Sequence, residues 1–327
     1  MKIKTKIIAE IGNNHNSKFE LACRIVEKAI EVNSDLVKFQ IYSKDEFIHR
    51  KSTYYNEFKK ERLSYTMFEK IFYKYNKFIK VIATPFDVPS ANFLNSLPLE
   101  AIKIASGDID NFLMFEEILK KKNNIIFSTG GASFKEIQST FNFLKQNSKK
   151  VTPLHCIASY PAKLMDTNLG YIDYLKKKLK TEIGFSDHYE GITASCLAIQ
   201  KKVVYLEKHF TINKSLPGGD NSISTDPEEL AEIINFRDNY DKIFSVKKRI
   251  YSLNEKKTKN IIRRIFFSKN KTSANDKIDP KSLIFVRVNK IVSSDLTGKD
   301  YFKIKNEKVK KKIKPLERLK KNIYEKI

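Results

Sequence analysis

Two lysines stand inside segments of the sequence that are otherwise apolar. Lys38 has Leu and Val on one side and Phe on the other, and Lys103 lies between two isoleucines. A buried ammonium group is costly unless an anion holds it, and for one lysine alone a salt bridge to a nearby carboxylate is a sufficient explanation. Hydroxyl residues end several similar segments, and with them the two lysines predict a site for a phosphate or carboxylate. These hydroxyl residues are Thr84, Ser106, Ser128 and Ser186.

Two histidines occupy equivalent places at the ends of two further apolar segments. They are His188 and His209, and Asp187 and Glu207 lie close to them in the sequence. Imidazoles on neighbouring strands can chelate one divalent ion and leave other positions for water and substrate, so we predict a metal site. Asp187 and Glu207 are predicted to support the two ligands. The mixed nitrogen and oxygen donors suit Mn, Mg, Co or Zn, and the sequence does not choose among these metals.

His155 and Cys156 are adjacent in a third apolar segment. Neighbouring residues on a strand point to opposite faces, which disfavours a Cys–His nucleophile. We interpret His155 as a core histidine with its hydrogen bonds satisfied.

The elements that position these residues alternate between two patterns. Eight short β-branched runs are predicted to be buried parallel strands, and a helical pattern follows each of them. Eight such repeats in about 240 residues indicate an α/β fold of the (β/α)8 TIM barrel type, whose active site lies where the strands end. A doubly wound sheet is the alternative, but no Gly-x-Gly-x-x-Gly follows the first run. The predicted strands are 6–12, 36–42, 80–86, 101–107, 124–130, 151–160, 182–188 and 203–210.

The helical segments show apolar residues at helical spacing. The aromatic stretch from Asp45 to Tyr65 is instead expected to be an elaborated loop over the top of the barrel. The predicted helices are 19–32, 111–122, 133–146, 168–179, 192–201 and 226–244, with a short one opening at Pro89 and Ser90.

After residue 244 the pattern changes. A polar, weakly periodic stretch is followed by short apolar runs that turn-like segments separate. We therefore predict a barrel domain over 1–244, a linker over 245–262 and a small β-rich domain over 263–327.

The chain has 327 residues and a formal net charge of +24. Residues 244–327 hold 26 basic and 8 acidic side chains, an excess of +18, and the rest of the chain holds +6. This pattern is compatible with a surface for nucleic acid or membrane, but it lacks aromatic residues interleaved for base stacking. We favour solvated lysines of a compositionally biased protein over nucleic-acid binding.

Other features concern the cellular compartment. No stretch of about 18 apolar residues is present, so no transmembrane helix is predicted. The amino terminus lacks the apolar core of a signal peptide. Three cysteines without paired spacing fit a reducing environment. We expect a cytoplasmic protein without a membrane partner.

A set of short motifs follows in order along the chain. The motifs are Ala-Glu10-Ile-Gly-x-Asn-His15, Val-Lys38-x-Gln40, Thr84-Pro-Phe, Lys103-Ile-x-Ser106-Gly, Ser128-Thr-Gly, His155-Cys, Tyr160-Pro, Ser186-Asp-His188, Glu207-x-His209-Phe and Pro217-Gly-x-Asp220. This set resembles the sialic acid synthase family, which contains N-acetylneuraminate synthase and related bacterial nonulosonic acid synthases. The likeness covers nearly the whole chain, and residues 265–327 resemble a diverged form of the family's antifreeze-like SAF domain.

The resemblance implies a transferase that condenses phosphoenolpyruvate with an N-acylated hexosamine. The product is a nine-carbon α-keto acid sugar, and phosphate is released through C–O cleavage. It also implies a divalent metal, most often Mn or Mg, and a domain-swapped homodimer in which the SAF domain covers the partner's barrel. A catalytically silent sugar-binding protein on the same fold is the alternative.

The resemblance also implies roles for individual residues, and Glu10, Lys38, Lys103 and His188 are the implied catalytic residues. Phosphoenolpyruvate is held by Lys38, Thr84, Lys103, Ser106, Ser128 and Ser186. The amino sugar is held by Glu10, Gln40, Tyr160, Asp220 and Arg287, and the metal by His188 and His209.

The chain departs from the family pattern at Asp108, at Ala158 and at Val288-Asn289, which follow Arg287 in the small domain. These departures weaken the case for N-acetylmannosamine itself as the acceptor. Pro217-Gly-Gly-Asp220 favours the neuraminate or legionaminate branch over the pseudaminate branch.

Overall fold

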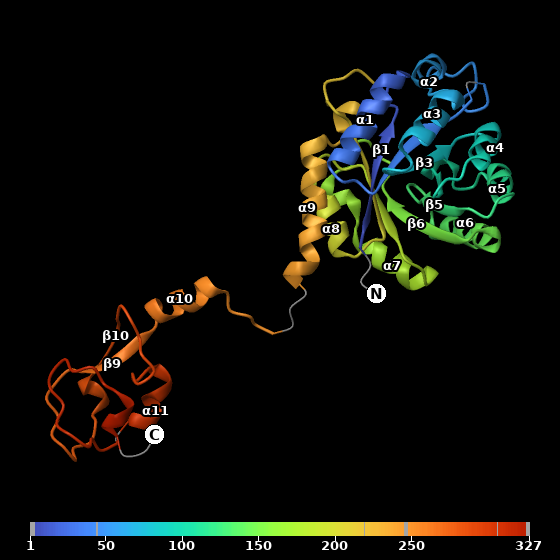
Figure 1. Cartoon of the computed structure of the whole chain (residues 1–327). Coiled ribbons are helices and arrows are strands. Elements are labelled where there is room, and N and C mark those ends of the chain that lie inside the picture. Colours follow the sequence, from blue (N-terminus) through green and yellow to red (C-terminus); the bar gives the residue numbers. More distant parts are fainter. Residues whose placement is uncertain (1–3, 44, 219, 245–247, 306, 325–327) are drawn as a thin grey trace. The chain divides into compact units, whose positions relative to one another are not determined.

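A computed structural model describes residues 4–43, 45–218, 220–244, 248–305 and 307–324, without the side chains of residues 57, 59 and 260. The chain forms two compact units, residues 1–245 and 246–327 (Figure 1). The first unit contains every predicted site residue except Arg287. The start of the predicted linker, at residue 245, lies outside the described residues.

Eight parallel strands close into a barrel in sequence order. Closure is made by β1 and β8, which pair from Lys6 with Tyr205 to Glu10 with His209. The expected (β/α)8 fold is therefore confirmed. The strands are β1 Lys6–Gly12, β2 Leu36–Ile41, β3 Lys80–Pro85, β4 Ile102–Ile104, β5 Asn124–Ser128, β6 Lys150–Cys156, β7 Gly184–Asp187 and β8 Tyr205–His209.

The helices surround the barrel (Figure 1). Several of them begin with side-chain caps. For example, Asp87 accepts a hydrogen bond from Ser90 N ahead of α4, and Ser133 and Glu136 form a reciprocal capping box at α6. The helices are α1 Phe19–Glu31, α2 Tyr55–Glu61, α3 Tyr65–Tyr75, α4 Val88–Ser96, α5 Phe112–Leu119, α6 Phe134–Asn147, α7 Gly170–Leu179, α8 Thr193–Gln200 and α9 Pro227–Phe244.

Alternation along the strands divides the apolar residues into two clusters. One face packs against the helices in the main core. The other face fills the amino-terminal half of the barrel interior, where Tyr205 packs against a small buried cluster. That cluster consists of Ile8, Leu36, Ile82, Ala101, Ile126 and Leu154. Apolar side chains thus fill the barrel interior near the amino ends of the strands. The interior near the carboxyl ends is left for polar side chains.

Three segments differ clearly from the prediction. The strand predicted over 151–160 ends at Cys156. The strand predicted over 101–107 ends at Ile104, because Ser106–Asp108 form a 3₁₀ helix. The stretch predicted as a loop over 45–65 contains α2 and leads into α3. Aromatic residues of this stretch pack on the barrel: the ring of Phe47 lies 4.8 Å from those of Tyr42 and Phe86. The segment is therefore anchored by ring packing that its spacing did not reveal.

The second unit is small and has its own apolar core, which includes Phe266, Leu296 and Ile313. It begins with helix α10 (Leu253–Ile262) within the predicted linker, and it also holds the short helix α11 (Tyr301–Ile304). Strands β9 (Arg264–Ser268) and β10 (Leu283–Arg287) pair antiparallel. The SAF assignment of this unit stays a prediction.

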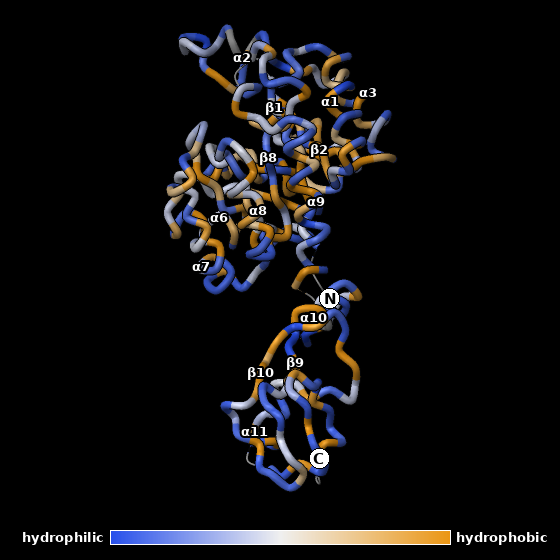
Figure 2. Tube along the Cα trace, turned by 90° about the vertical axis from the view of Figure 1, so that its left-hand side faces the viewer, coloured by the Kyte–Doolittle hydropathy of each residue, from blue (hydrophilic) through white to orange (hydrophobic). Residues whose placement is uncertain are grey.

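None of the described helices is both long and apolar enough to cross a membrane. Barrel helices such as α6 and α7 alternate between hydrophobic and hydrophilic stretches (Figure 2). This is the pattern of helices that pack one side on a core.

Candidate active site

On each of the strands β1, β2 and β6, the polar side chain of the barrel interior comes two residues after the apolar interior residue and points to the same face. Counting by two leads from Ile8 to Glu10 on β1 and from Leu36 to Lys38 on β2. The same step leads from Leu154 to Cys156 on β6. Since all eight strands are parallel, these residues form one layer at the carboxyl ends of the strands, where TIM barrels carry their active sites.

This layer lines a single cavity of about 270 Å³. Its volume is near the lower end of small-molecule pockets, which start at about 300 Å³. The lining includes twelve residues that were predicted to act in the site: Glu10, Lys38, Gln40, Thr84, Lys103, Ser106, Ser128, Tyr160, Ser186, His188, Glu207 and His209. The convergence of these side chains is the main structural fact about the site.

Lys38 is paired with two carboxylates of the protein. Its Nζ lies 3.1 Å from Glu10 Oε2 and 3.0 Å from Glu207 Oε1, and all three side chains are buried. Burial disfavours the charged ammonium, but Glu10 and Glu207 outweigh it and raise the pKa of Lys38. The salt-bridge alternative is thus what the structure shows for Lys38, whose burial requires no external anion.

The pKa values of Glu207 and Glu10 are shifted in opposite directions. Burial raises the pKa of Glu10 despite its contact with Lys38. Burial acts in the same direction on Glu207, but Lys103 and Lys38 together lower the pKa of that carboxyl to about 2. Glu207 is therefore ionised at neutral pH, and Glu10 is the carboxyl better suited to exchange a proton.

Lys103 is less completely paired. Its Nζ donates to Ser128 Oγ at 2.7 Å and to Ile104 O at 3.0 Å, and the nearest carboxylate oxygen, on Glu207, is 3.8 Å away. Burial lowers the pKa of Lys103 to about 8, because Glu207 compensates only in part. An anion entering the cavity would complete the pairing of this ammonium, so Lys103 is the stronger candidate for holding one.

A pH dependence follows from the lowered pKa of Lys103. Above about pH 8 the free protein carries neutral Lys103, and an anion must then restore the proton in order to bind. A phosphate monoester is already doubly ionised there, since its second pKa is about 6. For phosphoenolpyruvate, the anion that the family resemblance implies, we expect the affinity to be flat from pH 7 to 8 and to fall about tenfold per pH unit well above 8. Calorimetry in buffers of different ionisation heat measures this, and a flat profile to pH 10 would contradict it.

The hydroxyl residues have different partners. Ser128 accepts from Lys103, Ser186 donates to Glu207 Oε1 at 2.9 Å, and Ser106 accepts from Gly130 N at 3.0 Å. Among the described residues, neither Thr84 Oγ1 nor Glu207 Oε2 has a hydrogen-bond partner, and both atoms are buried. Buried polar atoms are normally satisfied, so these orphaned atoms indicate that a polar ligand completes the cavity.

The two histidines fit a divalent ion, although no group of three or more His, Cys, Asp or Glu in the described part of the chain could hold one. Their ring centroids lie 5.6 Å apart. His188 Nδ1 bonds Ile157 O at 2.7 Å, which leaves Nε2 as the free nitrogen, and burial together with His209 lowers the pKa of His188 to about 3. His209 Nδ1 is buried without a hydrogen-bond partner. A metal requires imidazole nitrogens that carry no proton and have no other partner, and both rings offer a nitrogen toward this role.

Glu10, Gln40 and Asp220 gather around Gly12 at the end of β1, although Asp220 is not among the residues that line the cavity. Gln40 Nε2 donates to Glu10 Oε1 at 3.0 Å, and Asp220 Oδ2 lies 3.6 Å from His209 Nδ1. A Cβ on Gly12 would meet oxygens or nitrogens of all three, with Asp220 Oδ2 at 2.9 Å. The missing Cβ therefore leaves room among three groups that suit sugar hydroxyls.

Tyr160 and Arg287 are the remaining predicted sugar residues. The ring of Tyr160 is exposed and lies 4.1 Å from that of His188, next to the cavity. Arg287 ends β10 in the second unit and is exposed there.

The comparisons with known proteins agree with this geometry. A model of the NeuB family matches residues 25–249. The N,N'-diacetyllegionaminic acid synthase of Campylobacter jejuni is 34% identical over 81% of this chain and 85% of its own. An uncharacterised protein of Methanocaldococcus jannaschii is 37% identical over 71% of this chain and 69% of its own. The chain belongs to the NeuB family.

The structure of this NeuB-family chain is similar to that of a solved synthetase. The N-acetylneuraminic acid (sialic acid) synthetase of Leptospira borgpetersenii, solved in complex with citrate, has a TM-score of 0.71 and 34% sequence identity. The match covers 78% of this chain and 90% of that one. The expected enzyme class, a transferase like the sialic acid synthases, is confirmed.

Two site residues of this NeuB-family protein differ from prediction. Asp187 does not support the histidines from inside, because its carboxylate bonds Lys208 and Ser195 on the outer face of the barrel. Cys156 was set aside with His155, yet it lines the cavity with Sγ 3.7 Å from His188 Nδ1. Counting by two from Leu154 would have placed Cys156 inside and His155 outside. His155 Nε2 bonds Thr167 O at 2.7 Å in the core, as its apolar surroundings predicted.

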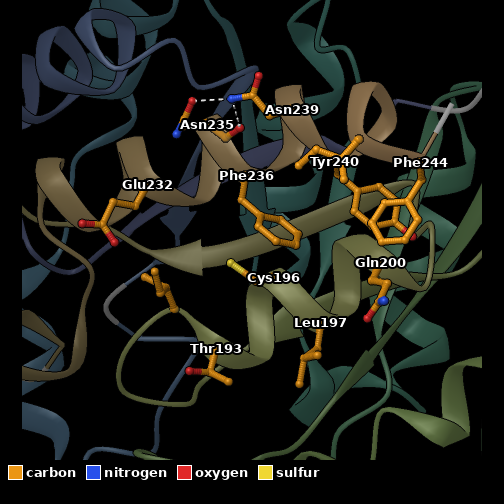
Figure 3. A pocket seen from close by; sticks show the side chains of 12 residues that line it. Thr193, Cys196, Leu197, Gln200, Glu232, Asn235, Phe236, Asn239, Tyr240 and Phe244 are labelled. Atoms are coloured by element: carbon orange, nitrogen blue, oxygen red, sulfur yellow. Dashed lines mark hydrogen bonds between the residues drawn. The ribbon is translucent and has the colours of Figure 1, made fainter. Parts of the chain in front are cut away.

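A larger hollow of about 840 Å³ lies elsewhere, between α8 and α9. Figure 3 shows its lining, with Phe236 of α9 facing Cys196 and Leu197 of α8. The lining contains one carboxylate, Glu232, and no lysine, arginine or histidine. Because the titratable groups converge in the smaller cavity, we place the chemistry there.

The space beside Gly12 gives a matched pair of variants. Gly12 and Gly131 both have positive φ, +51° and +74°, but a Cβ on Gly131 would meet nothing within 4 Å. With the two substrates that the family resemblance implies, Gly12→Ala is expected to raise the KM for the N-acylated hexosamine about tenfold and to leave the KM for phosphoenolpyruvate within twofold. Gly131→Ala carries similar backbone strain and should change neither. Equal effects of the two variants on the sugar KM would contradict the placement of the sugar.

Proposed function

We propose that this protein condenses phosphoenolpyruvate with an N-acylated hexosamine in its open-chain aldehyde form. The acceptor class includes N-acetylmannosamine and 2,4-diacetamido-6-deoxy relatives, and the product is a nine-carbon α-keto acid sugar. The observation that carries the proposal is one cavity in which two ammonium groups, several hydroxyls and two imidazoles meet. The legionaminic acid synthase named among the relatives supports a product of the sialic or legionaminic type.

Phosphoenolpyruvate is held on the side of the lysines. Lys103, with Ser128 and Thr84, provides donors for one of its anionic groups, and Lys38, with Ser106 and Ser186, lies beside them. Donors fixed before the substrate arrives place the enol carbon for attack and cost no reorganisation during the reaction.

The reaction joins C3 of phosphoenolpyruvate to the aldehyde carbon of the sugar. The aldehyde oxygen takes up a proton, and Glu10, whose pKa is raised by burial, is positioned to supply one. Water then adds at C2 of the former phosphoenolpyruvate, and the adduct loses inorganic phosphate by C–O cleavage. A keto group remains at C2.

A divalent ion, Mn or Mg, would be held by His188 and His209. When bound, it would supply Lewis-acid polarisation of the aldehyde carbonyl. The chain's own part is to present one ring nitrogen from each imidazole there, and the bond to Ile157 O orients the ring of His188. A domain-swapped dimer whose SAF domain brings Arg287 to the partner's sugar also remains a proposal.

The test is phosphate release from phosphoenolpyruvate with Mn²⁺ and a panel of N-acyl hexosamines, with product masses measured. Release that depends on one class of sugar supports the condensation. A folded protein that binds sugar by calorimetry, but neither binds phosphoenolpyruvate nor releases phosphate, would instead be the silent sugar-binding protein.

A further inference from the structure

A buried ion pair lies behind the two histidines, on the outer face of the barrel. Asp187 ends β7 and immediately precedes His188, and Lys208 immediately precedes His209 on β8. The two charged residues are register partners. Lys208 Nζ lies 3.1 Å from Asp187 Oδ2, and the side chains are 1% and 0% exposed. The pair thus joins the two strands at the point where each turns its imidazole into the cavity.

The same pair also fixes the chain that leaves β7. Tyr189 N donates to Asp187 Oδ1 at 2.9 Å, and Lys208 Nζ donates to Tyr189 O. Ser195 Oγ of α8 donates to Asp187 Oδ2 at 2.5 Å. The backbone on the carboxyl side of His188 is therefore held at both its N–H and its C=O group. The carbonyl oxygen of His188 itself accepts a hydrogen bond from Ala162 N at 2.9 Å.

A buried ion pair is a poor source of stability, because desolvation of the two charges offsets most of their attraction. Its retention is better explained where it fixes a geometry. Alternation puts the pair outside and the imidazoles inside on adjacent residues, so a shift of β7 against β8 would move both imidazoles. We propose that Asp187 and Lys208 are positioning residues that hold His188 and His209 at the separation required for a shared divalent ion. This inference rests on the metal site of the proposed function.

The barrel supplies a matched control at its other end. Asp35 pairs with Arg237 of α9 and accepts from Ile7 N at 2.8 Å, near the amino ends of β1 and β2. Arg237 is buried, with 4% of its side chain exposed, whereas Asp35 is 31% exposed. This second pair also ties a helix to the strands, but it lies far along the strands from the cavity lining. Its loss should affect folding alone.

The test measures Mn²⁺ binding to the full-length protein by the electron paramagnetic resonance signal of free Mn²⁺, alongside thermal unfolding. The double variant Asp187→Asn/Lys208→Met removes both charges at nearly constant volume, which a fold commonly tolerates. We expect its Mn²⁺ Kd to rise at least about tenfold, as when groups supporting a metal ligand are lost. Metal-free binding of phosphoenolpyruvate should stay within twofold. Asp35→Asn/Arg237→Met should leave the Mn²⁺ Kd within twofold.

A folded Asp187→Asn/Lys208→Met protein with a wild-type Mn²⁺ Kd would overturn the inference. If that protein does not fold, Ser195→Ala decides, because it removes one bond to Asp187 and keeps the charges paired. A threefold rise in Kd supports the inference, and an unchanged Kd overturns it. Wild-type protein that binds no Mn²⁺, or binding that survives His188→Ala, would instead refute the metal site itself.

Discussion

Replacing His188 with alanine is expected to remove Mn²⁺ binding and to lower turnover about a thousandfold. The imidazole is neutral at pH 7, and its hydrogen bond to Ile157 O leaves one nitrogen free for the cavity. Loss of a ligand from a two-histidine site leaves one protein nitrogen, and a Lewis acid is worth several kcal/mol of transition-state stabilisation. Turnover with added Mn²⁺ and direct Mn²⁺ titration measure the two effects.

His155 provides the control for that experiment. It is as buried as His188 but points to the outer face, where it bonds Thr167 O and its ring lies 5.7 Å from that of Phe185. His155→Gln should lower the unfolding temperature and keep Mn²⁺ affinity and kcat within a few fold. A His188→Ala protein that binds Mn²⁺ like wild type would show that the metal assignment is wrong.

Replacing the two lysines with methionine is expected to have opposite effects on stability. Lys103→Met removes an incompletely paired buried ammonium, so the unfolding temperature should be unchanged or higher, while phosphoenolpyruvate affinity falls about a hundredfold or more. Lys38→Met leaves the buried carboxylates of Glu10 and Glu207 without their shared counter-charge. It should therefore lower the free energy of unfolding by about 3–5 kcal/mol. Thermal and urea unfolding, with calorimetric titration of phosphoenolpyruvate, separate the two.

The comparison between the lysines tests the electrostatic description of the site. If both variants were destabilised equally, Lys103 would have a counter-charge that the described contacts do not contain. If Lys103→Met bound phosphoenolpyruvate as tightly as wild type, the anion would have to be held elsewhere.

The barrel could be predicted because each strand carries its own signal. Runs such as Lys6–Gly12 and Asn124–Ser128 are apolar and β-branched, and helical spacing follows each of them. Strand ends were less predictable. The strand expected to reach residue 107 stops at Ile104, because Ser106 and its neighbours form a 3₁₀ turn that places the Ser106 hydroxyl beside Gly130. The packing of Phe47 against Tyr42 and Phe86 is tertiary, so spacing along the chain could not reveal the anchoring of that segment.

The membership of the site was predictable, but its internal pairing was not. Polar residues at strand ends identified the lysines and histidines. Glu207 was predicted to support the histidines, but its carboxylate pairs with the two lysines. This pairing depends on barrel closure, which brings β8 beside β1 and within reach of β2 and β4. Alternation along the strand predicts that Asp187 points outward and Cys156 points into the barrel. Applied to every strand, this rule predicts both positions correctly from the sequence.

The most direct test of the whole account follows one oxygen atom. Phosphoenolpyruvate labelled with ¹⁸O at the bridging C–O–P position is incubated with the protein, Mn²⁺ and the N-acyl hexosamine that supports turnover. We predict that the label leaves with inorganic phosphate and that the nine-carbon product takes its C2 oxygen from water. Unlabelled phosphate, with the ¹⁸O retained in the organic product, would contradict condensation through C–O cleavage in this cavity.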